Sequence, residues 1–213
     1  MTGIMGPNGA GKSTLLQAIM GMIPVQQGRI IRNYSRRDIA YLPQQAEIDR
    51  TFPIRVLDTV LLGHWRLTGP FRSVSPALRD SALDALAAVG LEGFGKRPIG
   101  SLSAGQFQRV LFARVMLQDC RVILLDEPFT AIDARTTADL LALLRRWNTE
   151  KRTVIGVLHD IDQVREYFPE TLLMARECIA WGNTREVLSE SYLKQAKSLS
   201  EKWDYDAAVC WKN

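Results

Sequence analysis

The spacing of apolar residues changes in a regular order along the chain, and each change predicts a new element. Residues 13–20 have helical periodicity, which Gly21 and Pro24 end, and residues 39–42 read as a short strand that Pro43 ends. From residue 104 the pattern alternates strictly. It predicts a helix over 104–117, a strand over 121–125, a helix over 134–147, a strand over 153–158 and a helix over 161–168. This rhythm is typical of an α/β protein built on a parallel sheet.

The middle of the chain is predicted to be mostly helical. Residues 56–65 and 76–89 carry apolar residues at helical spacing, the second run with Pro76 at a first-turn position. Residues 90–100 have the composition of a loop. Toward the end, residues 171–174 and 178–181 are predicted to form a closing pair of strands, and an exposed helix and tail follow from residue 184.

Composition narrows the class of protein. The 213 residues are 46% hydrophobic and 23% charged, as expected for a globular protein of one large or two small domains. Apolar runs fall well short of the ~20 residues of a membrane-spanning helix, and the first residues have no secretory-signal pattern, so we expect a cytoplasmic protein. Three widely spaced cysteines, Cys120, Cys178 and Cys210, predict reduced, mostly structural thiols. The net charge of +4 is too mild to indicate nucleic acid binding.

The strongest chemical signal is the segment GPNGAGKST, which matches the phosphate-binding pattern G-x-x-x-x-G-K-[ST] at every required position. Its glycines let successive backbone N–H groups face an anion at the positive end of a helix. We expect Lys12 to reach the β- and γ-phosphates and Ser13 to place its hydroxyl on Mg²⁺. An ordinary glycine-rich turn is the alternative, which the number of matched positions disfavours. The predicted ATP-binding residues are Gly6, Pro7, Asn8, Gly9, Ala10, Gly11, Lys12, Ser13 and Thr14.

A second signal is VILLDEP, in which four apolar residues predict a buried strand and two carboxylates follow it. Open α/β sheets bind ligands at the carboxyl ends of their strands. Asp126 is therefore expected to hold the magnesium shell, and Glu127 to orient and deprotonate the water that attacks the γ-phosphate. The alternative is that these carboxylates belong to an ordinary turn. The presence of the phosphate-binding segment in the same chain disfavours that alternative.

A third signal is LSAGQ. Ser103 and Gln106 have the S-x-x-Q spacing of a capping box, which predicts a well-started helix. A capped helix start with the small residues Ala104 and Gly105 is also an anion site, which could contact the γ-phosphate of an ATP held by another subunit. Both interpretations can hold together.

In this order the three motifs resemble those of the ATP-binding subunits of ABC transporters, over residues 1 to about 188. The resemblance implies a P-loop NTPase fold. A RecA-like core of residues 1–45 and 106–188 would carry an inserted helical signature subdomain of residues 46–105, with a tail at 189–213. By position, Gln44 of YLPQ matches the Q-loop glutamine, Ile132 and Asp133 fall in the D-loop, and His159 of VLHD matches the γ-phosphate-sensing switch histidine.

The same resemblance assigns roles. Glu127, His159 and Gln44 would be catalytic, and Ser13, Gln44 and Asp126 would hold Mg²⁺. Residues 103–106 would contact the ATP of a partner subunit. His64 matches no motif and is expected to be a surface or packing residue.

The family pattern also implies partners. Two cassettes, as a homodimer or a mixed pair, would enclose two ATP molecules head to tail. Gln44 and residues 46–65 would face a membrane permease, so that the cassette sits peripherally on the inner face of the cell membrane. A periplasmic or extracellular metal-binding protein would act through the complex, and no nucleic acid partner is expected.

The substrate is inferred from two further segments. EIDRTFPIRVLDTVLLGHW and RECIAWGNTREVL resemble the cassettes of bacterial zinc and manganese importers. We favour import of a divalent metal, zinc before manganese, with iron-complex import as the alternative. Two rivals are an ABC-type protein of DNA repair or translation, whose coiled coil or second cassette is not seen here, and a truncated, non-catalytic cassette.

Two departures from the family pattern change the expectations. The signature reads LSAGQ where most members read LSGGQ, and we expect Ala104 to be tolerated. The sequence also starts five residues before Gly6, where family members normally carry early strands and an aromatic residue that stacks on adenine. We therefore expect the strand at residues 3–5 to lack its usual neighbours, and the chain to bind ATP weakly and fold poorly.

Overall fold

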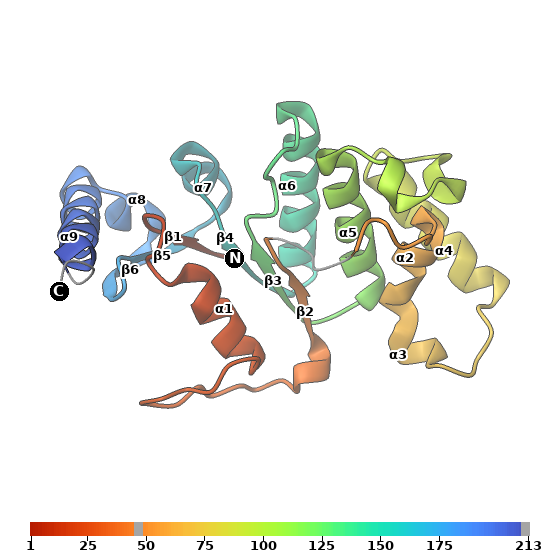
Figure 1. The fold of residues 1–213 in the computed structure, drawn as a ribbon, viewed down its shortest axis with the longest axis horizontal. Helices are drawn as coiled ribbons and strands as arrows, with labels where there is room; N and C mark the ends of the chain where they lie inside the picture. The colour runs from red at the N-terminus through yellow and green to blue at the C-terminus, as the bar shows by residue number, and fades with distance from the viewer. Residues whose placement is uncertain (45–48, 210–213) are drawn as a thin grey trace.

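A six-stranded sheet runs through the molecule with helices on both faces (Figure 1). The computed structural model describes residues 1–44 and 49–209, the last eight by backbone alone. The strands are β1 (Thr2–Met5), β2 (Ile39–Leu42), β3 (Val122–Asp126), β4 (Thr153–Val157), β5 (Glu170–Met174) and β6 (Cys178–Asn183). Their order is β2-β3-β4-β1-β5-β6, with parallel neighbours except for the antiparallel pair β5 and β6. The predicted α/β class and closing strand pair are confirmed.

The helices agree with the predicted ones to within a few residues at most ends. They are α1 (Lys12–Met20), α2 (Val56–Leu61), α3 (Trp65–Thr68), α4 (Pro76–Ala88), α5 (Ala104–Gln118), α6 (Ala134–Thr149), α7 (Ile161–Tyr167), α8 (Thr184–Val187) and α9 (Glu190–Val209). Short 3₁₀ turns lie at Arg36–Asp38, Leu62–His64, Phe94–Lys96 and Ile99–Ser101. In the described part of the chain, no helix is long and apolar enough to cross a membrane.

β1 lies in the interior of the sheet. Thr2 is in register with Ile155 of β4 on one side and with Glu170 of β5 on the other. The expectation that this strand would lack its usual neighbours is therefore wrong. Its backbone groups are paired on both sides by strands from the second half of the chain, which satisfies them in the core.

β3 shows how the sheet buries both of its faces. All five of its residues are buried, and successive side chains point to opposite sides. Val122 and Leu124 pack with Leu16 of α1, while Ile123 and Leu125 belong to the larger core on the other face. Figure 1 shows α1 on one side of the sheet and α6 and α7 on the other. The carboxyl end of β3 is thus held firmly between two packed layers.

A second group of helices, α2, α4 and α5, packs together beyond the β2 edge of the sheet (Figure 1). Phe112 of α5 joins this group to the rest of the core, because its ring stacks on Phe129 at 6.2 Å and on Trp147 of α6 at 6.4 Å between centroids. The middle of α5 is therefore coupled through aromatic packing to the loop that follows β3 and to α6.

The helix predicted over 56–65 is interrupted. α2 ends at Leu61, a 3₁₀ turn covers Leu62–His64, and α3 continues to Thr68. The cause is the close approach of α5: a Cβ at Gly63 would lie 2.4 Å from the carbonyl oxygen of Arg114. The backbone distorts where the two helices touch, which helical spacing alone does not reveal.

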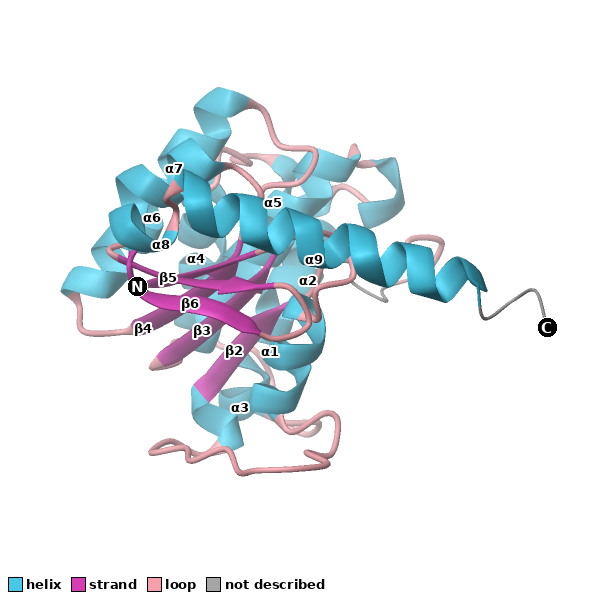
Figure 2. Ribbon diagram, turned by 90° about the vertical axis from the view of Figure 1, so that its left-hand side faces the viewer, coloured by secondary structure: helices cyan, strands magenta, loops and turns pink. Residues whose placement is uncertain are grey.

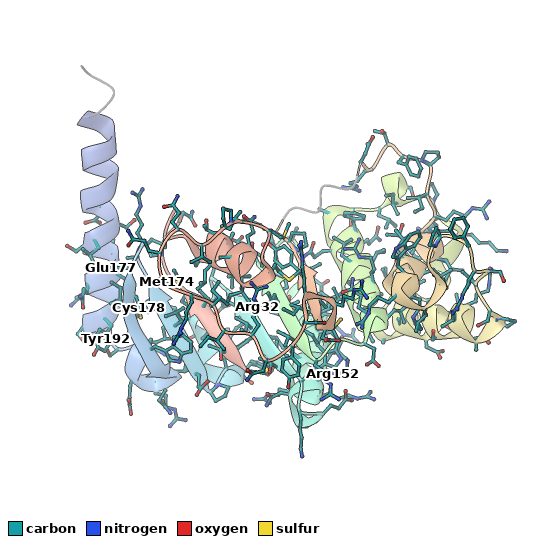
Figure 3. All side chains as sticks on the ribbon, turned by 90° about the horizontal axis from the view of Figure 1, so that it is seen from below. Arg32, Arg152, Met174, Glu177, Cys178 and Tyr192 are labelled. Atoms are coloured by element: carbon teal, nitrogen blue, oxygen red, sulfur yellow. The ribbon has the colours of Figure 1, made fainter. Side chains whose placement is uncertain are left out.

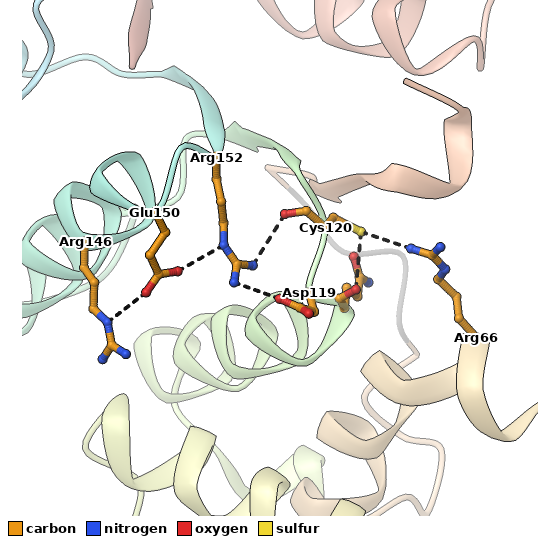
Figure 4. A network of polar contacts seen from close by, with 7 residues as sticks. Arg66, Asp119, Cys120, Arg146, Glu150 and Arg152 are labelled. Carbon is orange, nitrogen blue, oxygen red and sulfur yellow. Dashed lines mark hydrogen bonds and ion pairs between the residues drawn. The ribbon is translucent and has the colours of Figure 1, made fainter. Parts of the chain in front are cut away.

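The turns that precede β3 and β4 are tied together by an ion-pair network (Figure 4). Arg152 pairs with Asp119 at 2.7 Å and with Glu150 at 3.2 Å, and donates to the carbonyl oxygen of Cys120 at 3.5 Å. Arg146 extends the network to Glu150 at 3.1 Å. Exposed pairs contribute little singly, but shared partners hold both turns in one arrangement.

The cysteines agree with the reduced state that we predicted, as far as they are described. Cys120 is buried and Cys178 exposed, and both are free thiols. Cys210 lies outside the described residues. The helix predicted beyond residue 184 is present as α8 and α9, and Figure 2 shows α9 crossing beside β5 and β6, where Ala196 is buried.

Candidate active site

The predicted phosphate-binding residues form the turn between β1 and α1. Gly6 has a φ of 151°, and a Cβ there would lie 2.0 Å from the carbonyl oxygen of Met174. The backbone N–H of Ala10 donates to the carbonyl of Pro7 at 3.2 Å, and that of Arg176 donates to the carbonyl of Ala10 at 3.0 Å. The turn is therefore closed on itself and tied to the end of β5, and position 6 requires glycine.

Lys12 is the first residue of α1 and reaches back over this turn. Its Nζ donates to the carbonyl oxygens of Gly6 and Pro7, each at 2.9 Å, and the side chain is only 6% exposed. Burial lowers the pKa of Lys12, and the negative charges of Glu127 and Asp126 partly oppose that effect. A desolvated ammonium at a helix start favours an anionic ligand.

Asp126 ends β3 and is 2% exposed. Its Oδ1 accepts a hydrogen bond from Ser13 Oγ at 3.0 Å, and its Oδ2 accepts one from the phenol of Tyr41 at 3.3 Å. Burial raises the pKa of Asp126, although these two hydrogen bonds oppose the shift. Burial, together with the charge of Asp126, also raises the pKa of Tyr41 to about 12, so the phenol remains a donor at neutral pH.

Glu127 follows in a left-handed backbone conformation, with a φ of 49°. Its N–H donates to the carbonyl of Val157 at 3.1 Å, which ties this strained residue to β4. The carboxylate lies between two predicted catalytic side chains. Gln44 Nε2 donates to Oε2 at 2.7 Å, and His159 Nε2 lies 2.6 Å from Oε1. A carboxylate only accepts hydrogen bonds, so this ring nitrogen carries the proton.

These groups face one cavity of about 630 Å³. It is lined by residues 8–14 together with Gln44, Glu127 and His159. Its volume lies in the ordinary range for small-molecule sites. Backbone amides and Lys12 offer positive charge on one side, and Glu127 offers a base on the other. The arrangement can therefore hold a polyphosphate and place a water beside its last phosphate.

A hard cation fits beside the phosphate-binding turn. The hydroxyl of Ser13 and the carboxylate of Asp126 are oxygen donors of the kind that Mg²⁺ prefers. Among the residues that the structure describes, no three or more His, Cys, Asp or Glu side chains are grouped to hold a metal ion. Any Mg²⁺ at Ser13 and Asp126 would therefore need further oxygens from a phosphate ligand and water.

The signature residues start α5, as predicted. Ser103 Oγ accepts from the N–H of Gln106 at 3.2 Å, and Gln106 Oε1 accepts from the N–H of Ser103 at 3.0 Å, so the capping box is complete. Gly105 packs on the loop after Glu127, because a Cβ there would lie 2.4 Å from the carbonyl oxygen of Ala131. The described lining of the cavity does not include Ser103, Ala104, Gly105 or Gln106.

Asp133, which we expected in the D-loop, caps α6. Its Oδ1 accepts from the N–H of Thr136 at 2.9 Å and its Oδ2 from the Thr136 hydroxyl at 2.8 Å, which lowers the pKa of Asp133. His64, which matched no motif, is buried, and its Nε2 lies 2.8 Å from Ser81 Oγ. The packing interpretation of His64 is confirmed.

Sequence reasoning missed three contributors to the site. Tyr41 holds the second oxygen of Asp126, Met174 supplies the carbonyl against which Gly6 packs, and Gln108 Nε2 donates to the carbonyl of Pro128 at 3.2 Å. Tyr41 is the first residue of the YLPQ motif, three positions before Gln44, so the sequence did contain a signal for it. The other two contacts join segments too far apart in sequence for a local pattern to show.

Known proteins share this sequence pattern and fold. The family model for ABC transporters matches residues 1–130. The manganese transport system ATP-binding protein MntB of Listeria monocytogenes is 42% identical over 201 residues, covering 92% of this chain and 84% of that protein. The zinc transport system ATP-binding protein TroB of Treponema pallidum is 39% identical over 198 residues, covering 91% of this chain and 74% of that protein.

Solved structures of ABC transporter proteins match this chain as well. A metal-chelate type ABC transporter in an inward-facing conformation matches with a TM-score of 0.79 and 33% identity, covering 91% of this chain and 75% of that chain. The dimeric ATP-binding cassette MJ0796 bound to ADP and Pi matches with a TM-score of 0.77 and 28% identity, covering 87% of this chain and 85% of that chain. The family match and these relatives show that the chain belongs to the ABC transporter family, as an ATP-binding cassette that hydrolyses ATP.

Proposed function

We propose that this cassette hydrolyses ATP to power import of a divalent metal ion, zinc or manganese, through a separate membrane subunit. The observation that carries the proposal is the position of Glu127. Its carboxylate lies between Gln44 and His159 at a cavity whose other wall is the phosphate-binding turn. A base held by two hydrogen-bond partners opposite a polyphosphate site is the arrangement that hydrolysis requires.

In the proposed reaction, residues 6–14 hold the phosphates through backbone N–H groups and Lys12. Glu127 accepts a proton from a water molecule, whose oxygen forms a bond to the γ-phosphorus. The bond between that phosphorus and the β,γ-bridging oxygen breaks, which releases ADP and phosphate. His159 and Gln44 orient the carboxylate of Glu127 and contact the γ-phosphate side of the site.

We assign magnesium to Ser13, Gln44 and Asp126. Both side-chain oxygens of Asp126 are already oriented by hydrogen bonds, so the carboxylate is preset for a cation. When bound, Mg²⁺ neutralises charge on the β- and γ-phosphates. The chain's own part is to present Ser13 Oγ and Asp126 Oδ1, which lie 3.0 Å apart, toward one position.

A second cassette completes the site in this proposal. Residues 103–106 form a capped helix start suited to an anion, yet they are not among the described residues around the cavity of their own chain. Head-to-tail pairing, as a homodimer or with another cassette, would bring them to the partner's ATP. The dimeric form of MJ0796, which was solved with ADP and Pi, supports such pairing.

The metal and the membrane partner are proposed from the relatives. Their names include both manganese and zinc transport systems, so they do not rank the two metals, and the order that we favoured from the sequence stays a prediction. The metal-chelate type transporter, at 33% identity, supports iron-complex import as the second candidate. A metal-binding protein outside the membrane would deliver the cargo.

We further propose that Gln44 and residues 46–65 face the permease, which would hold the cassette at the inner face of the membrane. Residues 46–48 of that segment lie outside the described residues. The helices that pack beyond β2 support a signature subdomain over 46–105, set into a core of 1–45 and 106–188, with a tail from residue 189.

Light scattering on the Glu127→Gln variant tests the proposed chemistry. The variant should form an Mg-ATP-dependent dimer and release phosphate at least about 100-fold more slowly than the parent, because the base is lost. Glu92→Gln, at an exposed position outside the cavity lining, is the matched control and should turn over ATP like the parent. Parental turnover by the Glu127→Gln variant would contradict the assignment.

Growth of cells that lack the protein tests which metal is imported. Growth under metal limitation should be restored by added zinc or manganese if the proposal is correct. Restoration by a chelated iron source alone would move the assignment to iron-complex import.

A further inference from the structure

One face of α5 lies along the loop that begins at Glu127. In Figures 1 and 3, α5 lies between the sheet and the helices α2 and α4. Its contacts with the loop include three residues at helical spacing, which share one face of the helix: Gly105, Gln108 and Phe112. The first packs against the carbonyl of Ala131 and the last against the ring of Phe129. Between them Gln108 adds a polar contact, in which its Nε2 donates to the carbonyl oxygen of Pro128 at 3.2 Å.

Gln108 is a polar side chain inside the core, with only 8% of its surface exposed. Burying an amide is unfavourable unless the amide is hydrogen-bonded. An apolar side chain of similar length would fill the same space without that cost. The amide therefore has a role beyond packing, and its bond reaches the residue that directly follows Glu127.

Glu127 needs such a support, because its backbone is strained. Its φ of 49° lies in the left-handed region, which is unfavourable for a residue with a Cβ and persists only where the surroundings hold it. The N–H of Glu127 is held by the carbonyl of Val157 at 3.1 Å. Gln108 holds the next carbonyl, that of Pro128. The two bonds anchor the backbone on both sides of the Glu127 Cα, one to β4 and one to α5.

We propose that Gln108 is a positioning residue for Glu127, the general base. Its bond to Pro128 maintains the left-handed backbone of Glu127, and this conformation keeps the carboxylate 2.7 Å from Gln44 Nε2 and 2.6 Å from His159 Nε2. Without the bond, the backbone of Glu127 relaxes toward a negative φ and the carboxylate swings away from the attacking water. The inference rests on the proposed function, in which this carboxylate accepts the proton of that water.

Thr184 provides a matched case of a buried donor that is remote from the reaction. It is 3% exposed, and its Oγ1 donates to the carbonyl oxygen of Phe168 at 2.5 Å. Neither Thr184 nor Phe168 lines the ATP cavity. Thr184→Val therefore removes the same kind of bond, from a buried side chain to a main-chain carbonyl, without reaching Glu127.

Steady-state ATP turnover of Gln108→Met and Gln108→Asn tests the proposal. Methionine fills the space without a donor, and asparagine keeps the amide but is shorter by one methylene. We expect each variant to lower kcat about tenfold, because the base is no longer held in place. The KM for Mg-ATP should change by no more than about twofold, since Gln108 is outside the lining of the cavity that holds the phosphates. If Gln108→Met proves unfolded, Gln108→Asn carries the same prediction.

Thr184→Val is the control for a general loss of stability. Urea unfolding should show similar losses for Gln108→Met and Thr184→Val, because each leaves a buried carbonyl without its donor. Only the Gln108 variants should lose turnover. Parental kcat in the folded Gln108 variants, or an equal fall of kcat in Thr184→Val, overturns the proposal.

Gln108→Met combined with Glu127→Gln shows whether Gln108 acts through the base. The combined variant should release phosphate no more than about twofold more slowly than Glu127→Gln alone, because no base remains to be displaced. A further loss of about tenfold would reveal an independent effect and overturn the proposal. Light scattering on the combined variant should still show the Mg-ATP-dependent dimer. A monomer would mean that Gln108 acts through the signature residues and not through Glu127.

These measurements separate the inference from the proposed function. A large loss of turnover in Glu127→Gln, together with parental turnover in the folded Gln108 variants, would overturn this inference alone. Parental turnover in Glu127→Gln would instead contradict the proposed chemistry, and with it the premise on which the role of Gln108 rests.

Discussion

The phenol of Tyr41 lies 3.3 Å from Oδ2 of Asp126, so a residue of β2 holds the carboxylate that ends β3. Ser13 holds the other oxygen at 3.0 Å. With one donor on each oxygen, both the position and the rotation of the carboxylate are set before any ligand arrives. Tyr41 is thus a positioning residue for the group to which we assign Mg²⁺.

Tyr41→Phe removes this donor and leaves the ring. We expect the Mg²⁺ concentration for half-maximal ATP turnover to rise about tenfold, because the carboxylate can then rotate away from its preset orientation. The free energy of unfolding should fall by only about 1 kcal/mol. Magnesium titration at fixed ATP is the measurement, with the exposed Tyr34→Phe as control. Superimposable titrations of both variants and the parent would show that Tyr41 has a packing role only.

Gly6→Ala should disable the phosphate-binding turn. A Cβ at this position would lie 2.0 Å from the carbonyl oxygen of Met174, so either the turn or β5 must move. We expect a loss of more than about 2 kcal/mol in unfolding free energy and no measurable ATP binding. Gly28→Ala is the control: its φ is 80° but nothing lies within 4 Å, so only about 1 kcal/mol of backbone strain is expected. Equal effects at the two positions in chemical denaturation would contradict the steric argument.

The two small residues of the signature should respond differently to a change of one methyl group. Gly105→Ala places a Cβ 2.4 Å from the carbonyl oxygen of Ala131 and should push the start of α5 off the loop after Glu127. Turnover should fall at least about tenfold. Ala104→Gly changes an exposed first-turn position and should cost no more than about 1 kcal/mol, with turnover nearly unchanged. A phosphate-release assay on both variants would refute the argument if their rates were alike.

The stability of the ligand-free protein should depend on pH through Asp126. Because burial raises the pKa of Asp126, the folded state keeps this proton to a higher pH than the unfolded chain does. The contribution of Asp126 to stability is therefore present below about pH 4 and is lost as pH rises through the folded pKa. Asp126→Asn removes this titration, so the stability of the variant relative to the parent should rise with pH. Urea unfolding at a series of pH values measures it, and a constant difference would contradict the prediction.

Local patterns predicted most of the elements and the residues of the turn. The G-x-x-x-x-G-K-S pattern, the carboxylates after β3 and the capping box at Ser103 all depend on neighbours a few positions away. Such signals can be read without knowing the fold, because backbone conformation and capping are local properties.

The features that the sequence did not predict depend on contacts between segments far apart in the chain. The break of the helix at Gly63 is caused by α5, and the bond from Tyr41 to Asp126 crosses from one strand to the next. The expectation that β1 would lack its usual neighbours was wrong, because strand neighbours are a property of the whole sheet and not of any local pattern. The weak ATP binding and poor folding that we expected from the sequence remain predictions.

β1 and its turn are synthesised well before the two strands that flank β1 in the sheet. The strands that flank β1 are Thr153–Val157 and Glu170–Met174. At about 5–20 residues per second, translation reaches them on the order of ten to thirty seconds after the turn has been made. Until then the nascent chain lacks the Met174 carbonyl that closes on Gly6 and the histidine that meets Glu127. We therefore expect the site to take its final form only after residue 174 has been made, so that ATP acts on the finished core and not as an early template for folding.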